Sequence, residues 1–295
     1  MRRPRVPLTL MIMTIDRRMV LRGLSRAAAA GLLGAALAAA EAGRSSRSRS
    51  ARPVGPSRPS RGRDVAVAAA RWSAARPDVV PRSAWHPDPA HHEKPSLSAP
   101  SVKAVFVHHT DSGNDYSPGD VPELIQSFYN DHIESRDWGD IGYNFLVDRT
   151  GVIYEGRAGG VDNAVIGAHT LGFNVGTVGI AAIGSYGGGE PVPDAMLESI
   201  ARLCAWKLGM YGVDARGSTV LVSTNSGSRF ARGTRHVFRV ISGHRDGYCT
   251  RCPGDSLYAR LPDLRARAYD LQDRSAPAGT LPSVVPPSFV RRALS

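Results

Sequence analysis

Apolar, β-branched runs alternate with amphipathic helical patterns between residues 79 and 273. Residues 102–107 and 178–183 are expected to form buried strands because their apolar side chains follow one another almost without interruption. Residues 143–147 and 152–155 flank the turn sequence Asp-Arg-Thr-Gly and are typical of a hairpin. Strands that alternate with helices, together with one hairpin, predict a single α/β domain with a mixed central β-sheet flanked by helices.

Two segments have clear helical spacing. At residues 120–123, Asp-Val-Pro-Glu resembles a capping box with proline in the first turn. The residues that then recur on one helical face are Val121, Leu124, Ile125, Phe128 and His132. Between Asp194 and Gly212, apolar residues that include Cys204 mark one face of a long helix that glycine ends. A further strand is expected at residues 236–241, running into Ser242, and a closing helix at about residues 255–271.

Residues 1–42 have the pattern of an export signal. Arg17 and Arg18 precede an alanine-rich apolar run at residues 27–40, which resembles a twin-arginine signal peptide. The run is shorter than the roughly 20 residues of a transmembrane helix, and residues 38–42 offer small-x-small cleavage sites. We therefore expect a secreted or wall-located mature protein without a stable membrane anchor. The alternative is an amphipathic or buried N-terminal helix.

Residues 43–78 are expected to be a disordered linker rich in Arg, Ser and Pro, and residues 274–295 a disordered tail. The net charge of +11 divides into +5 for residues 1–42 and +7 for residues 43–63, which leaves −1 for the rest of the chain. The folded part therefore has no overall basic character, and nucleic acid is not an expected partner. The linker is either a solvated tether or, as a hypothesis, a segment that holds anionic wall polymers. Equal wall retention of full-length and linker-deleted protein across a salt series would reject the second interpretation.

Two histidines and one cysteine suggest a metal site. His108 and His244 each follow a predicted buried strand, where open α/β sheets place their ligands, and Cys252 lies eight residues beyond His244. Two imidazoles and a thiolate give Zn²⁺ three ligands and leave one tetrahedral position open, as in catalytic zinc sites. The alternative from spacing alone is that both histidines are structural or solvated.

Several short segments together resemble one known family. They are Val-Phe-Val-His-His-Thr at 105–110, Trp-Gly-Asp-Ile-Gly-Tyr-Asn-Phe at 138–145, Glu-Gly-Arg at 155–157, Gly-Ala-His-Thr at 167–170, Gly-His-Arg-Asp at 243–246, Thr250, and Cys-Pro-Gly at 252–254. In this order they resemble bacterial peptidoglycan recognition proteins of the catalytic type, which are zinc N-acetylmuramoyl-L-alanine amidases related to phage amidase-type lysozymes. The resemblance covers the whole predicted folded part. It implies hydrolysis of the amide bond between N-acetylmuramic acid and L-alanine in peptidoglycan.

The resemblance also implies roles for individual residues. Zinc would be held by His108, His244 and Cys252, whereas His109 is not carried over as a ligand. Tyr143 and Thr250 would be catalytic: the tyrosine would stabilise charge on the carbonyl oxygen, and the threonine would help to orient water or substrate. The residues implied to bind substrate are Trp138, His169 and Asn174.

Alternatives remain open at several of these positions. Tyr143 and Trp138 are also compatible with packing roles, and the carboxylates Asp140 and Asp246 are expected to be structural. Cys249 forms a Cys-x-x-Cys with Cys252, which allows a redox pair, a closed Cys₂His₂ zinc site, or a Cys249 that pairs with Cys204 or stays free. Three cysteines are too few for a disulfide-built scaffold, so the fold must depend on a hydrophobic core.

The main functional alternative is a non-catalytic peptidoglycan-binding module, because members of the resembled family that lack the zinc cysteine bind without cutting. Cys252 argues against this alternative here. A serine hydrolase is disfavoured because the chain has no Gly-x-Ser-x-Gly elbow.

Overall fold

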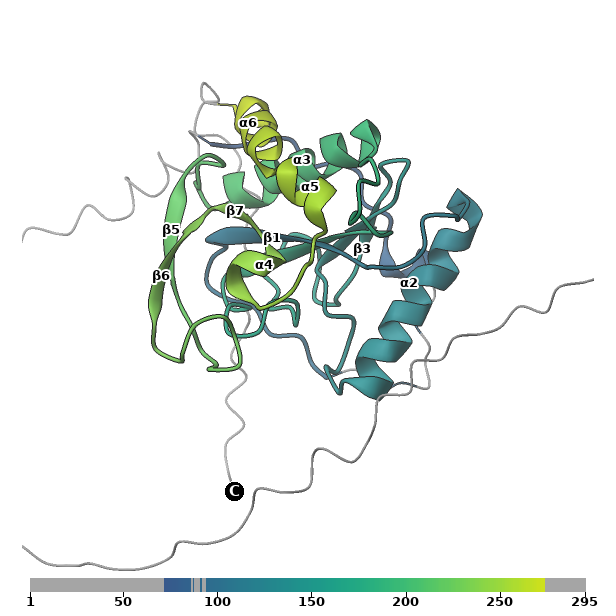
Figure 1. Ribbon diagram of the computed structural model, residues 1–295, viewed down its shortest axis with the longest axis horizontal. Helices are drawn as coiled ribbons and strands as arrows, with labels where there is room; N and C mark the ends of the chain where they lie inside the picture. The colour runs from purple at the N-terminus through teal and green to yellow at the C-terminus, as the bar shows by residue number, and fades with distance from the viewer. Residues whose placement is uncertain (1–71, 86, 88–90, 92–93, 274–295) are drawn as a thin grey trace, which may run out of the picture. The chain divides into compact units, whose positions relative to one another are not determined.

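The computed structural model describes residues 72–85, 87, 91 and 94–273 (Figure 1). The predicted signal peptide, the linker up to residue 71 and the predicted tail lie outside the described residues. The last part of the predicted linker is attached to the domain, because Ser73 forms a β-bridge with Asp273. The backbone carbonyl of Ser73 accepts a 2.6 Å hydrogen bond from the backbone N–H of Asp273. Within the described ranges, no helix is long and apolar enough to cross a membrane.

The central sheet has five strands in the order β3-β2-β4-β1-β7. Their bounds are Ala104–His109 for β1, Phe145–Val147 for β2, Ile153–Glu155 for β3, Thr177–Ala182 for β4 and Ile241–Gly243 for β7. The pairs β1 with β4, β1 with β7, and β2 with β4 are parallel, whereas β2 and β3 form an antiparallel hairpin. The predicted mixed α/β sheet is therefore confirmed.

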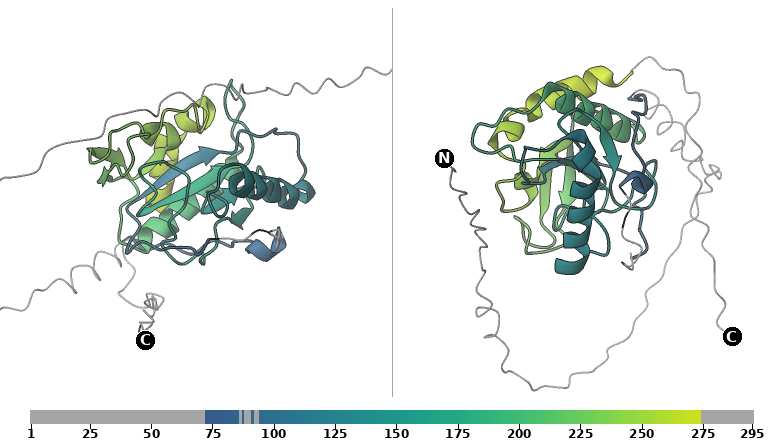
Figure 2. Two further views of the ribbon diagram at one scale, coloured as in Figure 1. Left: turned by 90° about the horizontal axis from the view of Figure 1, so that it is seen from below. Right: turned by 90° about the vertical axis from the view of Figure 1, so that its right-hand side faces the viewer.

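The helices cover both faces of this sheet (Figures 1 and 2). The longer ones are α2 at Val121–Asn130, which continues as the π-helix η3 at Asp131–Ser135, α3 at Asp194–Gly209 and α6 at Leu261–Leu271. The short ones are η1 at Arg82–Ala84, η2 at Pro118–Asp120, α4 at His244–Gly247 and α5 at Asp255–Ala259. Neighbouring side chains along β1 point to opposite faces. Val107 packs in the core under α3 and α6, whereas Phe106 packs in the core on the opposite face.

His108 lies on the face of the sheet opposite α3 and α6. His108, Ala181 and Leu146 are aligned across β1, β4 and β2, so their side chains share this face. Leu146 and Ala181 pack with Ile125 of α2 on one side. Next to His108 on the other side, Phe106 packs with a second, two-stranded sheet of β5 (Ser218–Val222) and β6 (Arg235–Arg239). His108 thus lies between α2 and the β5–β6 hairpin.

The structure corrects four details of the sequence prediction. The capping box is formed by Ser117 and Asp120 at the start of η2, not by residues 120–123. The strand predicted at residues 236–241 is divided between β6 and β7, which belong to different sheets. The closing helix is interrupted at Arg260 because Pro262, in the first turn of α6, lacks the N–H that a continuous helix needs. Finally, α3 ends at Gly209, and the chain turns at Gly212 with a φ of 67°.

Lys207 of α3 provides a test of the packing. Its side chain is 1% exposed, and its ammonium group donates hydrogen bonds to the carbonyls of Val161 (2.7 Å) and Asn163 (3.0 Å). Burial lowers the pKa of Lys207 from 10.5 to about 8. Between these values the unfolded state holds more protons than the folded state, so this group makes the free energy of unfolding rise with pH.

We expect the difference in unfolding free energy between wild type and Lys207→Met to grow from pH 7.5 to 10, in favour of wild type. Urea unfolding at several pH values measures it. Lys103→Met, which removes an exposed lysine, should show no such growth. Parallel pH profiles for wild type and Lys207→Met would contradict the burial argument.

Candidate functional site

Two parallel strands bring the distant histidines together. β1 and β7 are neighbours with Val107 opposite Gly243, so His108 at the end of β1 lies beside His244, the first residue of α4. Their ring centroids are 4.4 Å apart. Cys252, in the loop after α4, places its Sγ 3.8 Å from His108 Nδ1. The donor atoms of these three residues all lie within 4.8 Å of one another.

This donor set fits a zinc ion. With bonds of about 2.0 Å to nitrogen and about 2.3 Å to sulfur, tetrahedral coordination separates nitrogen from sulfur by about 3.5 Å. The 3.8 Å between His108 and Cys252 is close to that separation. Cys249 is exposed and is not part of the group, which disagrees with a closed Cys₂His₂ site. Cys204 is fully buried in α3 and unpaired, so the structure contains no bond between it and Cys249.

The histidines are held in their neutral form. Burial lowers the pKa of His108 well below its usual value, and the nearby His244 lowers it further. Burial also lowers the pKa of His244 to about 4. Both rings therefore offer a lone pair at neutral pH. Burial raises the pKa of the Cys252 thiol to about 12, so a thiolate at this position needs a nearby cation.

A chain of hydrogen bonds orients His108. With Nδ1 facing Cys252, its Nε2 lies 3.2 Å from His169 Nδ1. Nε2 of His169 lies in turn 3.4 Å from the hydroxyl oxygen of Thr177, whose proton goes to the Phe173 carbonyl at 2.6 Å. With the Thr177 proton on that carbonyl, we assign a donor to Nε2 of both His169 and His108. The Thr170 hydroxyl, 3.1 Å from His169 Nδ1, also donates to that nitrogen. The Nδ1 lone pair of His108 is then left for a metal.

His244 and Cys252 line a pocket of about 620 Å³ between α2 and the loop after α4, and His108, 1% exposed, lies beside them. Tyr143, Thr250, Trp138 and His169, four of the residues selected from the sequence, all line this pocket. The Tyr143 ring lies 5.4 Å from the His108 ring, and burial raises the pKa of its hydroxyl, which therefore stays protonated at neutral pH. The Thr250 hydroxyl oxygen accepts a 3.2 Å hydrogen bond from the Cys252 backbone N–H.

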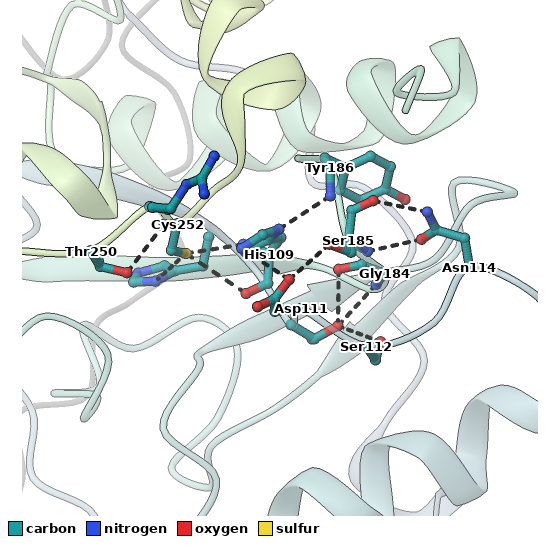
Figure 3. Close-up of polar contacts among 12 residues, drawn as sticks. His109, Asp111, Ser112, Asn114, Gly184, Ser185, Tyr186, Thr250 and Cys252 are labelled. Atoms are coloured by element: carbon teal, nitrogen blue, oxygen red, sulfur yellow. Dashed lines mark hydrogen bonds and ion pairs between the residues drawn. The ribbon is translucent and has the colours of Figure 1, made fainter. Parts of the chain in front are cut away.

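The pocket wall beside Cys252 is polar (Figure 3). The backbone N–H of His109 points at Cys252 Sγ at 3.4 Å, which favours the thiolate. The imidazole of His109 accepts a hydrogen bond from the Tyr186 backbone N–H at 3.2 Å, and the Asp111 carboxylate accepts one from the Ser185 hydroxyl at 2.7 Å. These contacts fix the loop that follows β1 against the loop that follows β4.

Comparison with known proteins shows the family of this chain. Residues 98–255, more than half of the chain, match the family model Amidase_2, described as N-acetylmuramoyl-L-alanine amidase.

The chain belongs to the Amidase_2 family.

Individual relatives match over different shares of their own length. Peptidoglycan-recognition protein LE of Drosophila melanogaster is 40% identical over 118 residues, so the match spans 40% of this chain but only 33% of the relative. A peptidoglycan recognition protein of Bombyx mori is 35% identical over 146 residues, or 48% of this chain and 70% of the relative. The human N-acetylmuramoyl-L-alanine amidase is 28% identical over 194 residues, or 63% of this chain and 28% of the relative.

A solved structure of peptidoglycan recognition protein LE in complex with tracheal cytotoxin, a monomeric diaminopimelic acid-type peptidoglycan, is also similar. It is 30% identical, covers 63% of this chain and 92% of its own, and superposes with a TM-score of 0.48.

Two residues discussed in the sequence analysis, Asn174 and Asp140, support the loops around the site. Asn174 does not line the pocket; its side-chain oxygen accepts hydrogen bonds from the backbone N–H groups of His169 (3.0 Å) and Thr170 (2.8 Å). It therefore shapes the turn that presents His169. Asp140, 1% exposed, accepts hydrogen bonds from Arg82 and the Ala158 backbone, which confirms its structural role.

The sequence patterns missed His132 as a site residue. The helical spacing placed it on the apolar face of α2, but it lies in η3 and lines the pocket beside Trp138, with ring centroids 4.6 Å apart. Its Nδ1 accepts a hydrogen bond from the Gly142 backbone at 3.1 Å, and burial lowers its pKa to about 4. Neutral His132 thus supports the Trp138 ring. The sequence carried no signal for this role, because the spacing of His132 is that of a residue packed on a helix face.

Proposed function

We propose that this protein is a zinc-dependent N-acetylmuramoyl-L-alanine amidase that hydrolyses the amide bond between N-acetylmuramic acid and L-alanine in peptidoglycan. The observation that carries the proposal is the convergence of His108, His244 and Cys252 beside a pocket that His244, Cys252 and Tyr143 line. Membership of the Amidase_2 family supports it.

His108, His244 and Cys252 would hold the ion. When bound, zinc supplies Lewis-acid chemistry: it polarises a carbonyl group and makes a water molecule more acidic. His169 holds the His108 ring at the angle that directs Nδ1 to the ion, and the His109 backbone N–H stabilises the negative charge on Cys252.

Tyr143 and Thr250 provide the polar groups around the reacting amide. The protonated Tyr143 hydroxyl donates a hydrogen bond to the carbonyl oxygen as negative charge develops on it, which lowers the barrier. The Thr250 oxygen accepts from the Cys252 backbone, so its own proton remains available to a water molecule or to the substrate. Trp138 offers a partly exposed ring to the stem peptide.

Release of free amino groups from purified peptidoglycan tests the proposal. We expect amine release by the zinc-loaded protein, no release after chelation, and no new reducing sugar ends. The competing candidate is a peptidoglycan-binding module without activity, which is favoured by the names of the recognition-protein relatives. Binding to peptidoglycan without amine release would support that candidate instead.

The proposed place of action is the cell wall, after export through the twin-arginine route. The signal pattern at residues 1–42 is the reason for this proposal. Fusion of residues 1–42 to a reporter that folds before export tests it: loss of export on Arg17→Lys/Arg18→Lys is expected, and unchanged export would contradict it.

His169 lines the pocket and is also expected to raise the affinity for zinc. Replacing it with alanine leaves the buried Nε2–H of His108 without its partner, so we expect zinc affinity to fall by about 10- to 100-fold. Competition with a zinc chelator measures this. His236→Ala, a histidine outside the donor group, is the control and should bind zinc as wild type does. Unchanged affinity in His169→Ala would contradict the orienting role.

A further inference from the structure

A second groove, of about 710 Å³, lies on the other side of α4 from the metal site. We call it the arginine groove, and define it by Arg229, His236 and Arg239 from the β5–β6 hairpin, Asp246 from α4, and Tyr258 and Arg265 from the last two helices. In Figure 1 the hairpin stands at the left of the domain, far from α2 at the right. The groove is separate from the pocket that Tyr143 and Cys252 line, because the two have no lining residue in common.

The three arginines are anchored but not neutralised. Each donates a hydrogen bond to a backbone carbonyl: Arg229 to Arg245 at 2.6 Å, Arg239 to Arg216 at 2.6 Å, and Arg265 to Ile241 at 2.8 Å. None of the three forms an ion pair with a carboxylate of the described part of the chain. A guanidinium group has five N–H donors, so each side chain keeps donors for a ligand.

The one carboxylate that lines the groove is already engaged. Asp246 accepts hydrogen bonds from the Gly243 backbone N–H at 2.9 Å and from the Tyr258 hydroxyl at 2.6 Å. In addition, residues 215–243 contain five arginines and no acidic residue. Burial lowers the pKa of Arg265, and the charge of nearby Arg239 lowers it further, whereas the charge of Asp246 raises it. The groove thus gathers positive charges that repel one another, which an anion would relieve.

The shape and the aromatic groups of the groove narrow the choice of anion. Several guanidinium groups along one groove suit a chain of phosphates, because guanidinium pairs with phosphate through two parallel hydrogen bonds. Nucleobases would need free aromatic faces for stacking. Here the Phe230 ring is already stacked on His236, with centroids 4.1 Å apart, and Phe238 is 2% exposed.

We infer that the arginine groove is a second binding site, which holds the phosphate groups of an anionic cell-wall polymer. The inference rests on the proposed function in one respect: a protein that acts on peptidoglycan would meet such a polymer in the cell wall. α4 carries His244 into the metal site and Asp246 into the groove, so a polymer in the groove keeps the protein next to the wall it would cut.

The test is direct binding of fluorescently labelled poly(glycerol phosphate) to the zinc-loaded domain. Arg229→Gln/Arg239→Gln removes two exposed groove arginines, and we expect at least a tenfold loss of affinity. The matched control is Arg202→Gln/Arg260→Gln, which removes the same charge from arginines paired with Glu198 and Asp263 outside the groove. We expect less than a twofold change for the control.

Two results would overturn the inference. Equal loss in both double variants would show a general charge effect with no site. Equal or tighter binding of a single-stranded oligonucleotide with the same number of phosphates would assign the groove to nucleic acid. Because binding is measured without turnover, and amine release is assayed on polymer-free peptidoglycan, failure of this inference and failure of the amidase proposal are separate results.

Discussion

Cys252→Ala is expected to lose zinc at micromolar metal concentrations and, with it, measurable amine release from peptidoglycan. The substitution removes the one anionic ligand of the donor group and leaves two neutral imidazoles. The loss of affinity should exceed the roughly 10- to 100-fold cost of removing an orienting partner such as His169. Metal content by mass spectrometry, together with amine release, measures both effects.

Cys249→Ala is the matched control for this variant. It removes a thiol three residues away that is exposed and outside the donor group. Metal content and amine release should both be those of wild type. Loss of zinc from Cys249→Ala would show that Cys249 is a ligand of a closed structural site. Full activity of Cys252→Ala would show that amine release does not depend on the metal site.

Tyr143→Phe is expected to reduce kcat by about 10²- to 10³-fold, the usual cost of losing one hydrogen-bond donor to a developing oxyanion. The phenyl ring keeps its packing against His108 and His132, so the fold and the zinc content should be unchanged. Turnover of a soluble muropeptide, with zinc content measured on the same sample, tests this.

Tyr211→Phe removes a hydroxyl from a tyrosine that follows α3 and does not line the pocket, and it should leave kcat unchanged. Wild-type turnover in Tyr143→Phe would reject the catalytic role. Loss of zinc in Tyr143→Phe would instead make Tyr143 a structural support of the metal site.

The core of the fold could be predicted from the sequence because its signals are strong and local. β1, β4 and α3 each bury a continuous or periodic set of apolar side chains, and the predicted segments agree with them to within a few residues. β5 and its pairing with β6 were missed because only one residue of each strand, Leu221 and Phe238, is buried. The rest of the hairpin is polar or exposed and gives no clear period-2 pattern.

The candidate site shows a similar division. His108 and His244 could be selected because both follow apolar strands, but their proximity depends on the parallel register of β1 and β7. No spacing in the sequence shows that register; the resemblance to the family implied only that the two histidines hold one zinc ion. The supporting role of Asn174 depends on the geometry of one turn. The arginine groove could not be predicted from the net charge. Residues 64–295 sum to −1 because acidic residues elsewhere cancel the arginines of the β5–β6 hairpin.

Hydrolysis of a defined muramoyl-peptide in H₂¹⁸O tests the central claim most directly. An amidase breaks the carbon–nitrogen bond, adds the oxygen of water to the lactyl carbonyl carbon, and transfers protons to the departing amine. Mass spectrometry should therefore find one ¹⁸O in the carboxylate of N-acetylmuramic acid and none in the released peptide, only when zinc and Cys252 are present. Recovery of intact muropeptide from a protein that binds it would contradict the account and identify a recognition module instead.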